Sequence, residues 1–429
     1  MTAVLGILNK QAVAIAADSA VTIGGSSGHK IFNRANKVFA LSKRHPVGIM
    51  LYNSATFLST PWETIIKVYR KQLADKSFPR LNDYIDDFII FLHSKNHYTS
   101  LDIQKVFFVN FSLNIINSII EDIAKSNKTL FESPTEENKM AFRNLLEEQL
   151  NNVCEFWNNQ KACPEFEKYS IEMFQNFSND AFHEVIKNRF IENGITVSVS
   201  IIEKFRLAVY RILVAQENRS NFTGLVFVGF GEEEIYPQLM PVNVSFVFDN
   251  RLRYYYDIQN SAIISDSNNG AVRPFAQTDV IDTILSGIDP NLNNTFLENF
   301  GELFKKYNLL ILEKIGETNP SLSAQIQALN TQSIIDEYSK MNQQILKENY
   351  IIPLMNAVSH LSKEDLAEMA ESLIYLTYLK RRITNAEESV GGPIDVAIIS
   401  KGDGFIWIKR KHYFKPELNA SFFDNYLKI

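Results

Sequence analysis

Thr2, Asp18 and Lys37 are the residues whose types and spacing are best suited to catalysis in this chain. A small residue at position 2 permits removal of Met1, which leaves Thr2 with a hydroxyl and a free α-amine. A threonine hydroxyl is a weak nucleophile that needs an adjacent base, and an α-amine with a pKa of about 7.7–8.0 can be that base near neutral pH. A nearby cation favours the neutral amine, so Lys37 is the candidate cation and Asp18 the carboxylate that orients it.

Three short apolar runs have to position these residues. The runs over 3–8 and 12–17 have strand length and are separated by a polar turn, a pattern that predicts a hairpin. Such a hairpin holds residue 2 inside a sheet instead of at a frayed end. A Gly/Ser segment over 24–28 then leads to a third run, which begins at Lys37.

The order of these features resembles the N-terminal region of proteasome β-type subunits, and most closely that of their bacterial ring-protease relatives. The shared pattern is an N-terminal Thr, a hairpin, an Asp-x-x-x-Thr element and a Lys that opens a later strand, here Thr2, Asp18 to Thr22, and Lys37. The gap from Asp18 to Lys37 is a few residues longer than usual. The resemblance implies an N-terminal-nucleophile hydrolase with an α+β fold, a four-layer αββα sandwich of two antiparallel sheets flanked by helices.

The resemblance also implies an oxyanion hole and a substrate cleft. In the family, a backbone N–H in a Gly-rich turn after the fourth strand stabilises the oxyanion. The matching turn here contains Tyr52 and Asn53 and has no glycine, but either residue keeps a backbone N–H that can serve. Thr22 and Gly24 are expected to bind substrate by pairing with an extended peptide as an added strand.

A supporting element is expected towards the C-terminal end of the chain. The family has an Asp-x-x-Ser-Gly-Gly element there, and Gly391-Gly392 matches its two glycines. This alignment puts Glu387 at the Asp position, which keeps the charge on a longer arm. It puts Val390 at the Ser position, which loses a hydroxyl, and Ser389 is the candidate to replace that hydroxyl.

Hydrophobic periodicity divides the rest of the chain into core segments and helical insertions. Two long blocks show apolar residues at helical spacing, and strand-like runs lie between and after them. The expected organisation is an N-terminal core part that carries the nucleophile (1–60), a helical insertion (61–219), core strands (220–276), a second helical insertion (277–355), a core helix with the C-terminal strands (361–415) and a tail (416–429).

Three local patterns add detail to these segments. The pair 249–250 is typical of a hairpin turn between two strands. The resemblance allows one alignment in which the pair 275–276 matches the start of a family helix. Ser362 and Asp365 form a capping box that begins another helix. The apolar stripe expected on that helix consists of Leu366, Met369, Ala370, Leu373, Leu376 and Leu379.

Composition argues against several classes of function. The 429 residues are 45% apolar and 21% charged, as in ordinary soluble globular proteins. The net charge of −6 argues against nucleic-acid binding, which usually needs a basic footprint. Cys154 and Cys163 are too few for a zinc site with four ligands, so no metal or cofactor is expected.

The N-terminal region and the apolar runs indicate a location. No basic segment precedes the first apolar run, and no apolar stretch approaches the ~20 residues of a membrane span. The two cysteines fit reduced thiols of the kind that cytosolic proteins keep. We therefore expect a cytoplasmic protein without membrane partners.

The function that these patterns favour is hydrolysis of peptide bonds by Thr2, as a threonine-type peptidase or amidohydrolase. Expected partners are a peptide or protein substrate, further copies of the chain in a ring or a smaller homo-oligomer, and an unfoldase. Two alternatives stay open. A non-catalytic assembly or adaptor protein that keeps the fold is favoured by Val390 and by the glycine-free turn at Tyr52. A small-amide hydrolase of the same superfamily would fit a closed acidic pocket.

Overall fold

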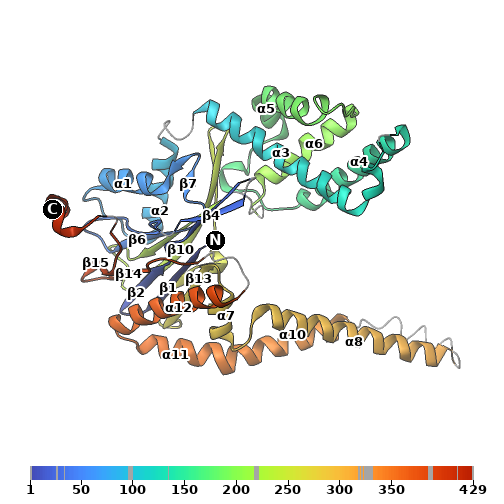
Figure 1. Cartoon of the computed structure of the whole chain (residues 1–429). Coiled ribbons are helices and arrows are strands. Elements are labelled where there is room, and N and C mark those ends of the chain that lie inside the picture. Colours follow the sequence, from blue (N-terminus) through green and yellow to red (C-terminus); the bar gives the residue numbers. More distant parts are fainter. Residues whose placement is uncertain are drawn as a thin grey trace. The chain divides into compact units, whose positions relative to one another are not determined.

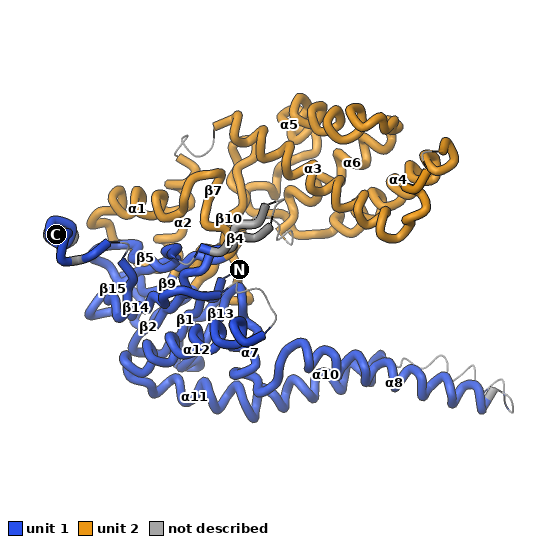
Figure 2. The backbone as a smooth tube through the Cα atoms, in the orientation of Figure 1, with its two compact units in different colours: residues 1–52, 228–239, 261–429 blue, residues 53–227, 240–260 orange. Residues whose placement is uncertain are grey.

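The computed structural model has an α+β fold and describes the chain except at positions 1, 26–27, 33, 95–99, 134, 217–221, 317–318, 320–321, 323–331, 385–389, 413 and 428–429. Two compact units make up the chain (Figure 2). Unit 1 comprises Met1–Tyr52, Val228–Leu239 and Ser261–Ile429, and unit 2 comprises Asn53–Phe227 and Met240–Asn260. The division into core segments and insertions that the sequence predicts follows different boundaries and stays a prediction.

The first sheet lies in unit 1 and has the strand order β13-β1-β2-β14-β15 (Figure 1). Its strands are β1 (Ala3–Asn9), β2 (Ala12–Ala17), β13 (Gly270–Ala276), β14 (Asp395–Ser400) and β15 (Gly404–Lys409). Neighbouring strands are antiparallel throughout this sheet. Every residue of β1 and β2 is buried, because the predicted hairpin forms and lies in the middle of the sheet.

Helices cover one face of the first sheet. They are α7 (Asp279–Ser286), α11 (Ile352–His360) and α12 (Lys363–Ile383). The apolar cluster between helices and sheet includes Leu5, Ala14, Ile281, Val358, Leu366, Ala370 and Ile374. The predicted capping box begins α12: Ser362 Oγ accepts from the Asp365 N–H, and the Asp365 carboxylate accepts from the Ser362 N–H.

The apolar stripe predicted for α12 is correct in its first half and wrong in its second half. Leu366 and Leu373 are buried, but Leu376 and Leu379 are 42% and 38% exposed. Thr377 is fully buried instead. At 3.6 residues per turn, position 377 lies about 20° from the direction of Leu366, whereas position 379 lies about 140° away.

The second sheet has the strand order β11-β10-β9-β6-β5, and β12 pairs with β10 outside this path. The registers of β5 with β6, of β10 with β11 and of β10 with β12 are antiparallel. The strands are β5 (Val38–Ala40), β6 (Val47–Asn53), β9 (Thr223–Gly229), β10 (Gln238–Phe248), β11 (Arg251–Tyr256) and β12 (Ala262–Ile263).

Two glycines lie where strands of the second sheet pack closely against the first sheet within unit 1. A Cβ on Gly6 of β1 would lie 2.4 Å from Cδ1 of Leu239 in β10. A Cβ on Gly48 of β6 would lie 2.8 Å from side-chain atoms of Ile399 and Phe405. The first sheet therefore has helices on one face and strands on the other, and the predicted α+β class with two antiparallel sheets is confirmed.

The turn between β10 and β11 confirms the hairpin predicted there. Asp249 and Asn250 have φ angles of 48° and 56°, and positive φ at both central residues is what a two-residue type I′ turn requires. The Asn250 N–H donates to Oε1 of Gln104 at 3.2 Å. Gln104 is fully buried, so its amide holds the turn from inside unit 2.

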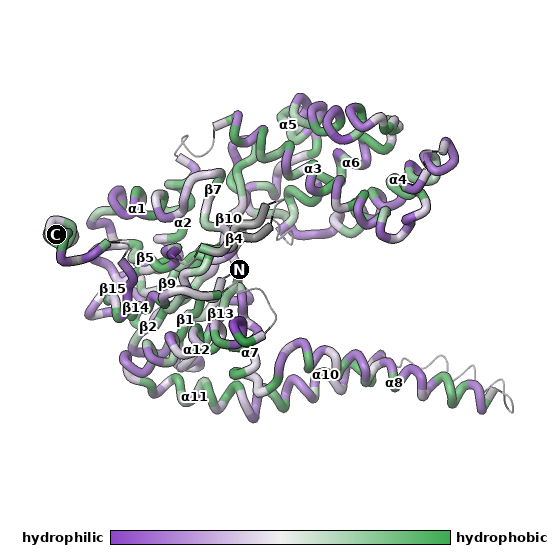
Figure 3. The backbone as a smooth tube through the Cα atoms, viewed as in Figure 1, coloured by the Kyte–Doolittle hydropathy of each residue, from purple (hydrophilic) through white to green (hydrophobic). Residues whose placement is uncertain are grey.

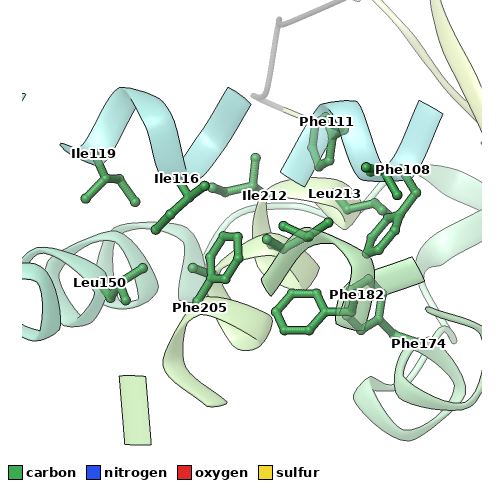
Figure 4. Close-up of a cluster of buried hydrophobic side chains, with 14 of the residues drawn as sticks. Phe108, Phe111, Ile116, Ile119, Leu150, Phe174, Phe182, Phe205, Ile212 and Leu213 are labelled. Atoms are coloured by element: carbon green, nitrogen blue, oxygen red, sulfur yellow. The ribbon is translucent and has the colours of Figure 1, made fainter. Parts of the chain in front are cut away.

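Unit 2 contains the first helical block. Two of its helices pack on β9: Trp62 Nε1 donates to Thr223 Oγ1 at 2.8 Å, and the rings of Phe88 and Phe227 meet edge to face with centroids 5.5 Å apart. The remaining helices share an apolar core with Phe246, Phe248 and Tyr255 of the second sheet (Figure 4). The α-helices of this block are α1 (Trp62–Leu73), α2 (Leu81–Ser94), α3 (Leu101–Ser126), α4 (Glu136–Asn158), α5 (Ile171–Ile186) and α6 (Val199–Val214).

The helix α3 corrects one expectation from the sequence. It is long and apolar enough, by length and composition alone, to cross a membrane, whereas we expected no stretch of that kind. Its apolar composition has another explanation in the fold. Phe108, Ile116 and Ile119 are buried in the core that α3 shares with α4, α5 and α6 (Figure 4).

The second helical block belongs to unit 1. Its long helices are α8 (Pro290–Gly316) and α10 (Gln332–Leu346), and a π-helical turn, Lys347–Ile351, joins α10 to α11. Phe300 of α8 stacks on Tyr338 of α10 with ring centroids 4.2 Å apart. Apolar positions alternate with polar ones along both helices (Figure 3).

Some strand pairings have no counterpart among the predictions from the sequence. Val21–Gly25 (β3) and Gly28–Phe32 (β4), at the Gly/Ser segment, pair as a hairpin. The pair 275–276, matched to the start of a helix, instead ends β13, and α7 begins at Asp279. Pairing with β1 extends β13 to this point, and pairing with a distant strand leaves no local signal in the sequence.

Candidate active site

Backbone hydrogen bonds of the first sheet hold Thr2 and Asp18 next to each other. Thr2 precedes β1, and its carbonyl accepts from the N–H of Gln277 at 3.0 Å. Asp18 follows β2; its N–H donates to the Ala3 carbonyl at 3.1 Å, and its Oδ1 accepts from the Ala3 N–H at 2.9 Å. Because β1 and β2 are paired in the middle of the sheet, the start of one strand meets the end of the other.

Lys37 lies just before β5 and reaches both residues with its side chain. Its Nζ donates to Thr2 Oγ1, to Asp18 Oδ1 at 2.6 Å and to the Ala20 carbonyl at 2.5 Å. Three acceptors match the three donors of an ammonium group. The Thr2 hydroxyl donates in turn to Asp18 Oδ1 at 3.2 Å. The structure thus brings together the three residues singled out in the sequence, here named the Thr2 cluster; their catalytic roles stay predictions.

The Thr2 cluster is closed to solvent. Thr2 and Lys37 are each 5% exposed, and Asp18 is 1% exposed. Burial lowers the pKa of Lys37, and the charge and hydrogen bond of Asp18 oppose that shift. Lys37 therefore gives up its proton more readily than a lysine in water.

A partly buried ion pair beside the Thr2 cluster acts on the charge of Lys37. Asp395 opens β14 opposite Ala17, and its carboxylate pairs with the Lys411 ammonium group. Asp395 raises the pKa of Lys37, and Lys411 lowers it. This pair has no signal in the sequence, because only the register of β2 with β14 brings residue 395 next to the end of β2.

A loop before β14 holds the Asp18 carboxylate from its other side. Asp18 Oδ2 accepts from the N–H groups of Ala20 and Gly391, both at 3.0 Å. The Ser19 N–H donates to the Gly391 carbonyl at 3.0 Å, and Ser19 Oγ donates to the Pro393 carbonyl. The double glycine used to align the C-terminal element therefore lies at the site, where it contributes a backbone N–H.

The other residues of that element have different outcomes. Val390 is 1% exposed and belongs to the apolar cluster under α12, so it packs and makes no hydrogen bond with its side chain. Glu387 and Ser389 lie outside the described residues, and their supporting roles stay predictions. The Gly391 N–H supplies a polar contact to Asp18 that the valine at position 390 cannot.

The residues predicted to form the oxyanion hole lie at the end of β6. Tyr52 is buried, and its ring stacks on Phe275 with centroids 5.3 Å apart. Asn53 has a φ angle of 71°, in the left-handed region where glycine is usual and asparagine is among the best-tolerated substitutes. The absence of glycine from this turn therefore has a physical explanation, and the role of either N–H in an oxyanion hole stays a prediction.

The residues predicted to bind substrate lie on β3. Thr22 is opposite Ile31 of β4, and Gly24 is opposite His29. Pairing with β4 occupies one edge of β3, so an extended peptide can add only at the other edge. Substrate binding by Thr22 and Gly24 stays a prediction.

The described part of the chain offers no cluster of three or more His, Cys, Asp or Glu side chains that could hold a metal ion. Cys154 and Cys163 are free thiols and are buried. Burial raises the pKa of both thiols, which leaves them without the thiolate character of a reactive cysteine.

Fold and site together define an α+β protein with two antiparallel sheets and a buried threonine–lysine–aspartate cluster at its central hairpin. Among solved structures, the chain is similar to an Anbu (Gly-1) mutant from Hyphomicrobium sp. strain MC1, with 9% sequence identity and a TM-score of 0.26 over 99% of this chain and 94% of that chain. No protein-family model and no curated protein sequence matches the chain. At this identity and TM-score, what the Thr2 cluster does has to be inferred from its own geometry.

Proposed function

We propose that the protein is an N-terminal threonine hydrolase that cleaves amide bonds, with Thr2 as the nucleophile after removal of Met1. One observation carries the proposal: the Thr2 hydroxyl, the Lys37 side-chain nitrogen and the Asp18 carboxylate contact one another in one buried cluster. A buried ion pair alone needs no hydroxyl, whereas a nucleophile needs an adjacent group that takes its proton.

The reaction has two steps that share one base. In the first, Thr2 Oγ1 bonds to the substrate carbonyl carbon, the base takes the hydroxyl proton, and the C–N bond breaks as the base protonates the leaving amine. The acyl group is then held as an ester of Thr2. In the second, the same base takes a proton from water, the water oxygen bonds to the ester carbon, and the bond to Oγ1 breaks. A carboxylic acid leaves and the hydroxyl is restored.

Two nitrogen atoms are candidates for that base. The α-amine of Thr2, with a pKa of about 7.7–8.0, becomes available only after Met1 is removed. Lys37 Nζ contacts Oγ1 directly, and burial lowers its pKa. The sequence predicts that the α-amine is the base and that Lys37 is the cation that favours its neutral form. The direct contact between Lys37 Nζ and Thr2 Oγ1 also supports Lys37 as the base. Acetylation of the α-amine separates the routes, because it blocks only the first.

A second candidate is a non-catalytic assembly or adaptor protein with the same fold. The burial of Thr2 favours it, since a residue 5% exposed gives a substrate little access. The packing of Val390 in the apolar core also favours it, because the expected hydroxyl is missing there. The presence of Thr2, Asp18 and Lys37 in mutual contact argues the other way, because a scaffold needs no nucleophile.

Mass spectrometry before and after treatment with a peptide epoxyketone distinguishes these functions. The reagent needs both the hydroxyl and the α-amine of an N-terminal threonine. We expect loss of Met1 and a single adduct on Thr2, with no adduct in the Thr2→Ala variant. Retention of Met1 without an adduct would favour the scaffold. Loss of Met1 without an adduct would call for a panel of small amides, which tests the small-amide hydrolase.

The proposal includes the partners and location that the sequence predicts. These are a peptide or protein substrate, assembly of the chain into a ring or a smaller homo-oligomer, an unfoldase that delivers substrate, and a cytoplasmic location. Sedimentation of the purified protein measures the oligomeric state, and fractionation of cells measures the location. A monomer that hydrolyses peptides would remove the ring from the proposal and leave the Thr2 chemistry intact.

A further inference from the structure

Unit 2 contains a cavity of about 280 Å³ whose lining combines apolar and basic side chains. Residues of α3 and α4 and the turn after α5 form its walls. Every charged side chain in the lining is basic, although the chain as a whole carries a net charge of −6. The apolar part of the lining is Ile120, Leu130, Phe131, Phe142 and Ile195, and the basic part is Lys139, Arg143 and Arg189.

Arg189 combines a place in the cavity lining with a buried donor. Its Nε is buried, and among the described residues it has no hydrogen-bond partner. A buried donor without an acceptor destabilises a protein, and native structures usually satisfy it with protein, water or a ligand. Arg189 lies in a π-helical turn, Lys187–Ile191, and such turns are frequent at functional sites. Asn193 holds the turn by donating to the Arg189 carbonyl at 3.2 Å.

The other basic residues have an acidic neighbour outside the cavity. Lys139 pairs with Glu136 at 2.7 Å, and both Lys139 and Arg143 lower the pKa of Glu136. Glu136 is not part of the lining. Glu136 therefore pairs with Lys139 and interacts with Arg143 at longer range. Arg189 is left to interact with an anion inside the cavity.

We propose that this cavity binds a small amphipathic carboxylate, with its carboxylate on Arg189 and Arg143 and its apolar tail against Phe131 and Phe142. A guanidinium group matches a carboxylate with two parallel hydrogen bonds. Lys139 is already paired with Glu136, so the guanidinium groups of Arg143 and Arg189 are the remaining cations of the lining. Since a water molecule occupies ~30 Å³ of liquid, the cavity has room for on the order of ten non-hydrogen atoms, the size of octanoate. This site is independent of the Thr2 cluster.

Isothermal titration calorimetry of the whole protein with octanoate tests the site. We expect saturable binding of one octanoate per chain at roughly submillimolar concentration and at least about tenfold weaker binding of 1-octanol, which has the same tail without the charge. Absence of saturation, equal binding of 1-octanol, or tighter binding of octyl phosphate than of octanoate would each overturn the assignment.

Variants locate the bound octanoate. Arg189→Gln and Arg143→Gln should each weaken binding by about tenfold or more. Lys187→Gln is the matched control, because Lys187 is exposed in the same π-helical turn and is not part of the lining. Thr2→Ala should bind octanoate as the natural sequence does, which excludes the Thr2 cluster as the binding site. Unchanged binding in both folded arginine variants would contradict the proposal.

Discussion

Two buried cations, Lys37 in unit 1 and Arg253 in unit 2, differ in what surrounds their charge. Lys37 is 5% exposed and Arg253 is fully buried, and burial lowers the pKa of both. Lys37 contacts a carboxylate and a hydroxyl. Arg253 contacts the backbone carbonyls of Leu213, at 2.8 Å, and of Ala215, and donates to Ser245 Oγ at 2.8 Å.

The difference separates a site for chemistry from a structural contact. The helix α6 ends at Val214, so its last carbonyl groups lack partners within the helix, and a cation there is stabilised by the helix dipole. A guanidinium group cannot lose its proton in a protein, so Arg253 ties β11 to the end of α6 and can do no acid–base chemistry. A lysine can lose its proton, and its neutral amine can then take the proton of a hydroxyl that it contacts.

Loss of the Thr2 hydroxyl is the largest expected effect. Thr2→Ala should lower kcat/KM for a peptide or amide substrate by about 10⁴-fold or more, as removal of other catalytic nucleophiles does. The free energy of unfolding should change by less than about 1 kcal/mol, because Lys37 keeps Asp18 and Ala20 as acceptors. Turnover and denaturant unfolding measure the two quantities. Thr2→Ser, which keeps a hydroxyl, is the control, and undiminished turnover in Thr2→Ala would rule out the mechanism.

Removal of the Arg253 charge should have the opposite effect, a large loss of stability with little change in turnover. Arg253→Met leaves the carbonyls at the end of α6 buried without donors, and we expect a loss of roughly 3–5 kcal/mol in the free energy of unfolding. The matched control on the same strand is Arg251→Met. Arg251 is partly exposed and pairs with Asp249 at 2.8 Å, so it should cost less than about 1 kcal/mol. Equal losses in the two variants would show that Arg253 has no special structural role.

The pH dependence of the free energy of unfolding also distinguishes Lys37 from Arg253. Because the folded-state pKa of Lys37 lies below its ordinary value of 10.5, the unfolded chain binds more protons between these two pH values. The free energy of unfolding contributed by Lys37 should therefore rise with pH across that window and be lost as pH falls through the folded pKa. Lys37→Met should remove this rise, and Arg253→Met should keep it. Parallel curves for Lys37→Met and the natural sequence would mean that the pKa is not lowered.

The smallest expected effect concerns the ion pair beside the cluster. Asp395→Asn removes a charge that raises the pKa of Lys37 and leaves Lys411, which lowers it. If Lys37 is the base, the acidic limb of kcat/KM should move to lower pH in Asp395→Asn and to higher pH in Lys411→Met, each by a fraction of a pH unit. Shifts of the same sign in both variants would show that the pair acts through structure and not through charge.

Local patterns predict much of the fold. The hairpin of β1 and β2, the type I′ turn at Asp249 and the capping box at Ser362 all form as the sequence predicts. Each depends on residues within a few positions of one another. The pairing of β13 with β1 is different, because its partners are more than 250 positions apart and the sequence there was matched to a helix.

Residue types and their order along the chain identify the groups that can do chemistry: a hydroxyl at position 2, a carboxylate at the end of the second strand and a lysine before the third apolar run. What surrounds these groups depends on the packing of the whole fold. The register of β2 with β14 places Gly391 on the Asp18 carboxylate and the Asp395–Lys411 pair beside the cluster. Burial, which lowers the pKa of Lys37, depends on packing among segments that are distant in the sequence. Side-chain type is a local property, whereas desolvation and charge at a site are sums over the whole fold.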